Sequence, residues 1–267
     1  MPFKTIYAQI AIIILFAASI AGCKSVQTAT AIPFTPGITE TDPILPTSSS
    51  NPTVTPLHLS PTLDLSVYAF PDSIDPAEQY LFYLHGKIIE DQGIPAISPD
   101  YGEFEYGEIL EKLSGYGFVV ISEQRPKNTD GVEYASRITE QITTLLNAGV
   151  QAKNITVLGA SKGAGIAIFV SQLLENKDIN YVIMAICHAD TLAELRQNQI
   201  PLHGNVLSIY DASDELAGSC QELFAFSEGK GLSRYDEIIL NIGTGHGILY
   251  QPLDEWIIPA VRWAGKP

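Results

Sequence analysis

The sequence predicts an α/β domain in which helices cover both faces of a mostly parallel central sheet. The first observation is that short apolar runs, typical of buried strands, alternate with segments of helical periodicity through residues 63–267. Such alternation is typical of parallel sheets with helices on both faces. The second is length, because about 205 residues suffice for one sizeable hydrophobic core. In a sheet of this kind, ligands bind at the carboxyl ends of the strands.

The apolar runs place the elements in order along the chain. Strands are expected over residues 63–70, 80–84, 118–122, 155–158, 181–187, 206–210 and 237–242. The first of these alternates apolar and polar residues, so we expect it to be half-exposed. One helix is expected to follow residue 102 and to end at residue 114, and another to begin after Ser161. Further helices are expected over residues 132–148, 191–197, 220–226 and 253–263. The remaining long segment, residues 87–102, is rich in Gly, Pro and acidic residues and is expected to be a loop.

The first residues have the pattern of an export signal. Lys4 precedes an apolar run, residues 10–21, which is short for a membrane span and has the composition of the hydrophobic part of a signal peptide. It leads into Ile20-Ala21-Gly22-Cys23, which resembles the lipobox of bacterial lipoproteins. The resemblance implies that residues 1–22 are a signal peptide and that Cys23 becomes the lipidated first residue. The alternative is an uncleaved anchor with an incidental cysteine.

Residues 23–62 differ in composition from the rest, being rich in Thr, Pro and Ser. Such a segment buries too little apolar surface to offset its ordering entropy, and its prolines keep it extended. We expect a disordered tether that holds the folded domain, residues 63–267, off a bacterial membrane on the periplasmic or cell-surface side. The formal net charge of −15 argues against binding to nucleic acid or to anionic lipid, so the lipid anchor is the membrane contact expected.

Cys187 and Cys220 are the only cysteines besides Cys23. An even pair in an exported protein is a candidate disulfide. Cys187 ends one expected strand and Cys220 follows the next, and if those strands are adjacent and parallel, both sulfurs lie at the same edge of the sheet. Two buried free thiols are the alternative, because sequence alone does not establish the geometry. The surrounding sequence has no His or Cys at metal-ligand spacing, so no metal site is expected there.

The segment Gly159-Ala160-Ser161-Lys162-Gly163 follows an expected strand and precedes a helical pattern. A serine at the tip of such a sharp turn adopts strained backbone angles. The residues two positions away must be small, because strand and helix nearly collide there. Gly159 and Gly163 meet that requirement. We therefore interpret Ser161 as a nucleophile, the alternative being a glycine-rich turn without chemistry.

A serine nucleophile needs a base to take its proton and a third group to orient that base. His246 is the favoured base, since it follows the last expected strand in a glycine-rich loop, and His188 is the competing candidate at the same edge. Asp214 is the favoured acid, because it lies a turn beyond the end of the preceding strand. Asp211 is closer to the sheet and is expected to shape the turn instead, and Glu215 is the remaining alternative.

The order Ser161, Asp214, His246, together with the glycine-flanked elbow and a His85-Gly86 pair after an earlier strand, resembles that of the α/β-hydrolases. The likeness extends over nearly the whole expected domain. It implies the α/β-hydrolase fold and a Ser–His–Asp triad built from the three residues in this order.

The same resemblance implies an oxyanion hole formed by the backbone N–H groups of Lys87 and Lys162. The His-Gly pair continues as Lys-Ile rather than Gly-Gly, which counts against the hormone-sensitive-lipase type, and Asp211 stands where many relatives have glycine. Only about 18 residues separate the expected strand that ends at Cys187 from the one that begins at Val206, which is too few for a large lid domain. The nearest likeness is to the compact esterase or dienelactone-hydrolase group, whose substrates bind in an open cleft.

Three basic residues, Lys87, Arg125 and Lys162, fall at the expected catalytic edge although basic residues are scarce. One hypothesis is that one or more of them bind an anionic part of the substrate, with His85, Gly86 and Arg125 as the candidate substrate-binding residues. The alternative is that the three cations are solvated or paired with nearby acidic residues, namely Glu90, Asp91 or Glu123.

These observations predict a serine hydrolase that cleaves a carboxylic ester, or else a thioester or amide, through an acyl-enzyme. Ser161 attacks the carbonyl, His246 transfers the proton and Asp214 orients His246. We expect a small-molecule ester as the substrate and neither a metal nor an organic cofactor. Two alternatives remain open, a serine peptidase of the same fold and a catalytically silent lipoprotein that binds a ligand or partner.

Overall fold

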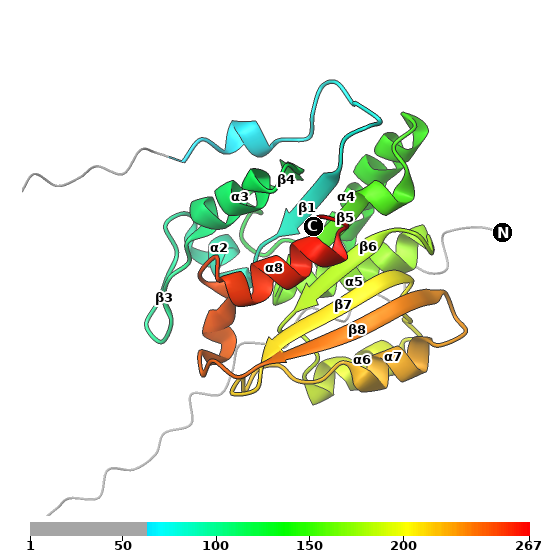
Figure 1. Ribbon diagram of the computed structural model, residues 1–267. Helices are drawn as coiled ribbons and strands as arrows, with labels where there is room; N and C mark the ends of the chain where they lie inside the picture. Colours follow the sequence, from blue (N-terminus) through cyan, green and yellow to red (C-terminus); the bar gives the residue numbers. More distant parts are fainter. Residues whose placement is uncertain (1–62) are drawn as a thin grey trace, which may run out of the picture. The chain divides into compact units, whose positions relative to one another are not determined.

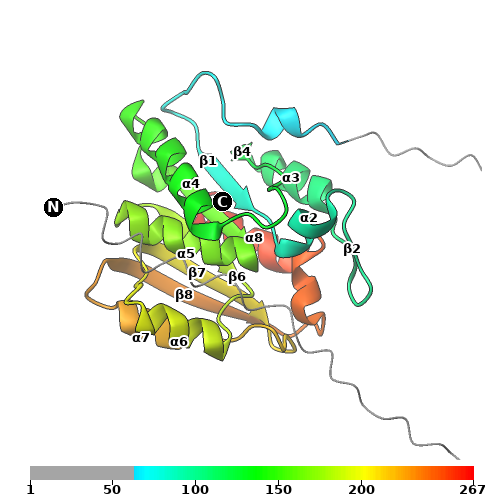
Figure 2. The same ribbon diagram turned by 180° about the vertical axis from the view of Figure 1, so that it is seen from behind.

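The computed structural model describes residues 63–267, so the predicted signal peptide, Cys23 and the tether lie outside the described residues. The described chain forms a six-stranded sheet with the order β4-β1-β5-β6-β7-β8, and all of its strand pairs are parallel. Helices pack on both faces of this sheet (Figures 1 and 2). The fold class predicted from the sequence is confirmed.

The strands of the sheet follow the predicted apolar runs, with shifts at their ends. They are β1 (Tyr80–Leu84), β4 (Val119–Ile121), β5 (Ile155–Ala160), β6 (Asn180–Met184), β7 (Gly204–Asp211) and β8 (Leu232–Leu240). Every residue of the three central strands β1, β5 and β6 is buried, as the uninterrupted apolar runs predict. The residues of the edge strand β8 are exposed or half-buried. The strand begins earlier than predicted, since its first half is polar and shows no apolar run in the sequence.

Two sets of helices cover the two faces. Figure 2 shows α4 (Gly131–Asn147), α5 (Lys162–Leu174), α6 (Ala189–Gln197) and α7 (Gln221–Ser227) on one side of the sheet. On the opposite side lie α3 (Tyr106–Gly115) and α8 (Asp254–Trp263), the latter in front in Figure 1. The described helices include none that is both long and apolar enough to cross a membrane.

Each face of the sheet has its own hydrophobic core, because successive side chains of a strand point to opposite faces. In β1, for example, Phe82 packs in the core beneath α4 and α5, whereas Leu81 packs in the core beneath α3 and α8. The segment between β6 and β7 contains only the short helix α6, so the described chain has no lid domain at that position.

Two sequence predictions about local structure are wrong. Residues 63–70 do not form a strand but contain a 3-10 helix, Leu65–Tyr68, whose N-cap Asp64 accepts a hydrogen bond from the N–H of Ser66 at 3.0 Å. Of this turn only Tyr68 is buried, and Val67 is 69% exposed. Residues 87–102 are not a plain loop either. They contain helix α2 (Lys87–Gln92) and the strand β2 (Ile97–Ser98), which pairs antiparallel with β3 (Gly102–Glu103).

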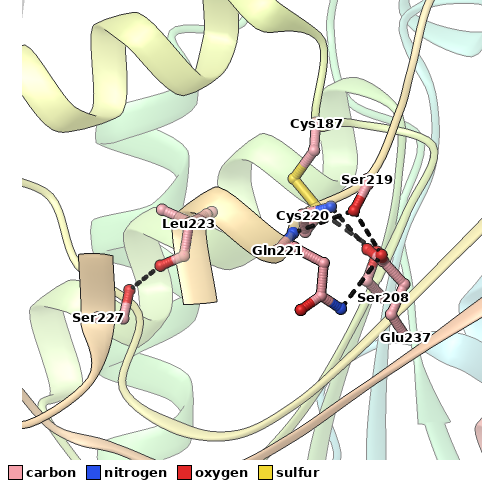
Figure 3. Close-up of a disulfide and its surroundings, with 8 residues drawn as sticks. All are labelled: Cys187, Ser208, Ser219, Cys220, Gln221, Leu223, Ser227 and Glu237. Atoms are coloured by element: carbon pink, nitrogen blue, oxygen red, sulfur yellow. Dashed lines mark hydrogen bonds between the residues drawn. A yellow bond between two sulfur atoms is a disulfide. The ribbon is translucent and has the colours of Figure 1, made fainter. Parts of the chain in front are cut away.

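A disulfide joins Cys187 to Cys220, with an Sγ–Sγ distance of 1.99 Å (Figure 3). Cys187 lies between β6 and α6, and Cys220 lies between β7 and α7, so the bridge joins the first parts of two consecutive crossover connections. Both cysteines are buried, and the carboxylate of Glu237 on β8 accepts hydrogen bonds from the N–H of Cys220 at 2.6 Å and from Ser219 Oγ at 2.6 Å. Of the two alternatives left open by the sequence, the structure has the bridged one.

Candidate functional site

Ser161 lies in the sharp turn between β5, which ends at Ala160, and α5, which begins at Lys162. Its backbone has φ 52° and ψ −117°, a left-handed conformation that is rare for residues other than glycine. Strain of this kind persists only where the surroundings enforce it. Here the N–H of Ser161 donates to the carbonyl of Met184 at 2.9 Å, and its carbonyl accepts from the N–H of Ala164 at 2.8 Å.

The two glycines that flank Ser161 are required by close backbone contacts. A Cβ added to Gly159 would lie 2.3 Å from the carbonyl oxygen of Gly163, and a Cβ added to Gly163 would lie 1.9 Å from the carbonyl oxygen of Leu84. Both distances are far below van der Waals contact, and both obstacles are backbone atoms that do not move aside easily. The glycines thus allow the helix to pass close beneath β1 and β5, which sets the serine at the carboxyl edge of the sheet.

A chain of two hydrogen bonds connects Ser161 to His246 and Asp214. His246 Nε2 lies 3.0 Å from Ser161 Oγ, and His246 Nδ1 lies 2.8 Å from Asp214 Oδ2. An ionised carboxylate only accepts hydrogen bonds, so Nδ1 carries the proton and Nε2 is free to accept from the hydroxyl. The Asp214 side chain is completely buried and the His246 side chain is 12% exposed. Three residues that are far apart in the sequence therefore have the geometry of a nucleophile, a base and an orienting acid.

The strand order and the strand–turn–helix position of Ser161 agree with the α/β-hydrolase fold, as does the chain order of the serine, the acid and the histidine. Asp214 follows β7 and His246 follows β8, so both come from loops at the same edge of the sheet as the serine. The competing base, His188, instead caps the N-terminus of α6, where its Nδ1 accepts from the N–H of Asp190 at 3.4 Å.

Asp211 shapes the loops, as predicted, rather than contacting the histidine. Its Oδ1 accepts from the N–H of Ser213 at 2.9 Å, and its Oδ2 accepts from the N–H groups of Ile242 at 3.0 Å and Gly243 at 3.1 Å. Burial alone would raise the pKa of Asp211, but a hydrogen bond from the Ser213 hydroxyl and these three backbone bonds hold the pKa below its ordinary value of 3.8. The ionised carboxylate thus joins the loop that carries Asp214 to the loop that carries His246.

Lys87 and Lys162, the predicted oxyanion-hole donors, are each the first residue of a helix. The first N–H groups of an α-helix have no acceptor within the helix, so they are available to a ligand. The loop that carries Lys87 lies beside the serine, since a Cβ added to Gly86 would lie 3.8 Å from Ser161 Cβ. Both amides therefore belong to segments that border the nucleophile.

His85 and Arg125, two of the predicted substrate-binding residues, do not reach the cleft. Both are completely buried, so neither can contact a substrate there. His85 Nε2 accepts from the N–H of Arg125 at 2.9 Å, and its Nδ1 lies 2.7 Å from the carbonyl oxygen of Gly86. Burial and the neighbouring Arg125 guanidinium lower the pKa of His85 well below 6.5, so the ring is neutral. The third predicted residue, Gly86, does line the cleft.

The three cations at this edge are paired with carboxylates. This favours the alternative in which they form ion pairs with nearby acidic residues over the one in which they bind an anionic part of the substrate. Lys87 pairs with Asp91 one helical turn further along α2. Arg125 Nε and Lys162 Nζ both bind Glu90, each at 2.6 Å. Glu123, also named as a possible partner, pairs with Arg137 instead.

A cleft of about 160 Å³ opens over Ser161 and His246. Its walls are largely apolar and comprise Gly86, Lys87, Ile88, Phe104, Leu249 and Tyr250. Ile88 could not be assigned to the cleft from the sequence, because residues 87–102 were expected to be a loop, and no sequence pattern marks Phe104, Leu249 or Tyr250 as cleft residues. Tyr101 extends the wall, with its ring centroid 5.3 Å from that of Tyr250 and 6.5 Å from that of His246. Within residues 63–267, no three His, Cys, Asp or Glu side chains form a group suited to a metal ion.

Comparison with known proteins gives neither a matching family model nor a matching curated sequence. Some solved structures resemble part of this chain. SOBER1 of Arabidopsis thaliana is 12% identical, with 71% of this chain and 98% of that one covered and a TM-score of 0.48. A predicted CIB-like hydrolase from Thermoplasma acidophilum is 14% identical, with 72% and 89% covered and a TM-score of 0.47. Similarity at this level is too low to assign an activity to this chain.

Proposed function

We propose that this protein is a serine hydrolase that cleaves a small carboxylic ester, or else a thioester or amide, through an acyl-enzyme. The observation that carries the proposal is the hydrogen-bonded chain from Ser161 Oγ through His246 to the buried Asp214. A serine hydroxyl is a poor nucleophile alone, and a positioned imidazole with an orienting carboxylate is the arrangement that activates it.

In the proposed reaction, Ser161 Oγ attacks the carbonyl carbon while His246 Nε2 accepts the hydroxyl proton. Asp214 keeps the proton on Nδ1 and stabilises the imidazolium that forms. The negative charge that develops on the carbonyl oxygen is met by the backbone N–H groups of Lys87 and Lys162. The imidazolium then protonates the leaving alcohol. A water molecule, activated by the same histidine, releases the acid and restores the serine.

The cleft favours a short, uncharged acyl or alcohol group. Its volume of about 160 Å³ is below the range of about 300–1,000 Å³ that is usual for pockets that enclose drug-sized ligands. The surrounding side chains Ile88, Phe104 and Leu249 offer apolar contact, and the nearest cation, Lys87, is already paired with Asp91. An anionic group on the substrate would therefore find no unpaired basic side chain among the residues that line this cleft.

Hydrolysis of p-nitrophenyl acetate by the purified domain, residues 63–267, tests this proposal. We expect turnover by the wild-type protein and none above background for Ser161→Ala. Ser136→Ala is the comparison, because that hydroxyl lies on α4, where it donates to the carbonyl of Val132 at 3.0 Å, outside the residues that line the cleft. Absence of turnover over a panel of acetyl, butyryl and thioacetyl substrates would contradict the proposal and favour a ligand-binding role.

We also propose that the mature protein is a bacterial lipoprotein held at the periplasmic or cell-surface side of a membrane through Cys23. The lipobox-like segment supports this proposal, and so does the Cys187–Cys220 disulfide, because such bonds persist mainly in oxidising compartments outside the cytoplasm. In a bacterial host, metabolic labelling with an alkyne fatty acid should mark the full-length protein. Cys23→Ser should remove the label, whereas equal labelling of both would contradict the anchor.

A further inference from the structure

Behind the cleft, a buried ion cluster consists of Glu90 on α2, Arg125 after β4 and Lys162 at the start of α5. Glu90 Oε1 accepts from Arg125 Nε at 2.6 Å, and Glu90 Oε2 accepts from Lys162 Nζ at 2.6 Å. The side chains of Glu90 and Arg125 are 1% and 0% exposed, and that of Lys162 is 14% exposed. Removal of charges from water is costly, so such a cluster is weak support for stability and calls for another role.

The Glu90–Lys162 bond connects the two helices whose first residues carry the proposed oxyanion donors. Helix α2 begins at Lys87, three residues before Glu90, and α5 begins at Lys162 itself. The Lys162 ammonium also donates to the carbonyl of Thr129 at 2.7 Å, so it is held from two directions. The bond therefore limits how far the Lys87 amide can move relative to the Lys162 amide.

Arg125 connects the same cluster to the peptide that bears the Lys87 amide. Its guanidinium donates from Nη2 to the carbonyl of His85, and its backbone N–H donates to His85 Nε2 at 2.9 Å. Since Nε2 accepts, the ring proton is on Nδ1, which donates to the carbonyl of Gly86 at 2.7 Å. The peptide between Gly86 and Lys87 is planar, so a fixed Gly86 carbonyl also fixes the direction of the Lys87 N–H.

We propose that Glu90 is a positioning residue that sets the separation and direction of the two oxyanion-hole amides through its bonds to Lys162 and Arg125. This inference rests on the proposed hydrolase function and deepens it. Glu90 acts through its partners and does not touch the substrate. The Lys162 ammonium likewise points to Glu90 and Thr129, and the cleft is lined by other residues.

Displacement of the two amides should change the kinetic constants in a specific way, because the amides bind the oxyanion of the transition state. Donors aimed at the developing oxyanion bind the transition state more strongly than the substrate, so their displacement lowers kcat and changes KM little. A displacement of about 1 Å in a catalytic site can lower the rate about 100-fold. A purely structural role would instead change the unfolding temperature without this separation of kcat from KM.

Lys162→Met tests the inference, because it breaks the connection between α2 and α5 while the Glu90–Arg125 pair stays charge-balanced. We expect kcat for p-nitrophenyl acetate to fall about tenfold to 100-fold with KM within twofold of wild type. The affinity for a small boronic acid, which forms a tetrahedral anionic adduct with the serine, should fall by a similar factor. Lys162→Arg, which can still bind Glu90, should recover most of the loss.

Lys112→Met is the matched control. The Lys112 ammonium also binds one carboxylate, that of Asp254 at 2.6 Å, and one carbonyl, that of Pro252 at 2.6 Å, but it lies outside the cluster and the cleft. The inference is overturned if Lys162→Met and Lys112→Met have the same kcat, or if Lys162→Met weakens substrate binding alone. It is also overturned if the boronic acid binds the folded Lys162→Met protein as well as wild type. An inactive wild-type protein would instead refute the hydrolase proposal itself.

Discussion

The two sides of the cleft are held in place by different interactions. One side, the triad side, carries the proposed triad Ser161, Asp214 and His246. There, backbone contacts at Gly159 and Gly163 set the serine, and the Asp211 carboxylate joins the loops of the other two residues by hydrogen bonds to backbone N–H groups. The other side, the oxyanion side, is the segment after β1 that carries the proposed donor Lys87, and buried ionic bonds of Glu90 hold it in place. The turn that carries Ser161 therefore depends on steric contacts of the backbone, whereas the segment after β1 depends on buried charges.

The largest expected effect is on the triad side and concerns activity alone. Asp214→Asn should lower kcat by about 10⁴, because an amide at this position favours the wrong histidine tautomer. The unfolding temperature should change little, since the side chain is nearly isosteric. Steady-state kinetics with p-nitrophenyl acetate measures the effect. Asp190→Asn, at an exposed position near the N-terminus of α6, is the control and should behave like wild type.

A steric change on the triad side should affect folding and activity together. Gly163→Ala places a Cβ about 1.9 Å from the carbonyl oxygen of Leu84, so α5 must move away from β1. We expect a loss of roughly 3 kcal/mol or more in the free energy of unfolding, measured by urea denaturation. Gly165→Ala, where the added Cβ would be 3.9 Å from Ile186, is the control in the same helix. Equal stability of the two variants would contradict the steric account of the elbow.

An ionic change on the oxyanion side should destabilise the domain by a similar or smaller amount. Arg125→Met leaves the buried Glu90 carboxylate with one partner instead of two. Removal of one partner from a buried pair costs about 3–5 kcal/mol, and the remaining Lys162 bond should hold the loss at the lower end. Urea denaturation of Arg125→Met against Arg137→Met, whose guanidinium pairs with the half-exposed Glu123, measures the difference. A smaller loss for Arg125→Met than for Arg137→Met would refute the proposed importance of the buried cluster.

The smallest expected effect is a difference in pH dependence between the two sides. The pKa of buried His85 lies well below 6.5, so its contribution to stability is complete above that pH and is lost as the pH falls, with a slope of at most about 1.4 kcal/mol per pH unit. The pKa of Asp211 lies below 3.8, so its contribution persists until the pH falls below that value. Between pH 7 and pH 5, His85→Gln should therefore flatten the stability profile, and Asp211→Asn should leave its shape unchanged.

The placement of Ser161, Asp214 and His246 at one edge of the sheet can be predicted from the sequence, because its determinants are local. The glycines around Ser161, and the ends of the strands before Asp214 and His246, are each visible in a short window of sequence. Parallel pairing then brings these strand ends to one edge without further information. The hydrogen bonds that connect Ser161, His246 and Asp214 are the direct result of that topology.

The oxyanion side is not predictable in the same way, because it depends on contacts between distant residues. The sequence leaves two roles open for Arg125, contact with an anionic substrate or pairing with a carboxylate. In the structure it is completely buried against Glu90 and His85, which lie 35 and 40 residues away in the sequence. Residues 63–70 show the same limitation. Their alternating pattern favours a strand, but Leu65 and Tyr68 are also at helical spacing. Tertiary contacts favour the helical turn, in which Tyr68 is buried.

The measurement that tests the central claim most directly is labelling of the folded protein with a fluorophosphonate probe, followed by mass spectrometry of the modified peptide. Labelling requires the serine hydroxyl, its base and an open cleft at once. The account predicts that wild-type protein is labelled on Ser161 alone and that His246→Ala is labelled far more slowly. A folded wild-type protein that remains unlabelled, or that is labelled equally fast without His246, would contradict it.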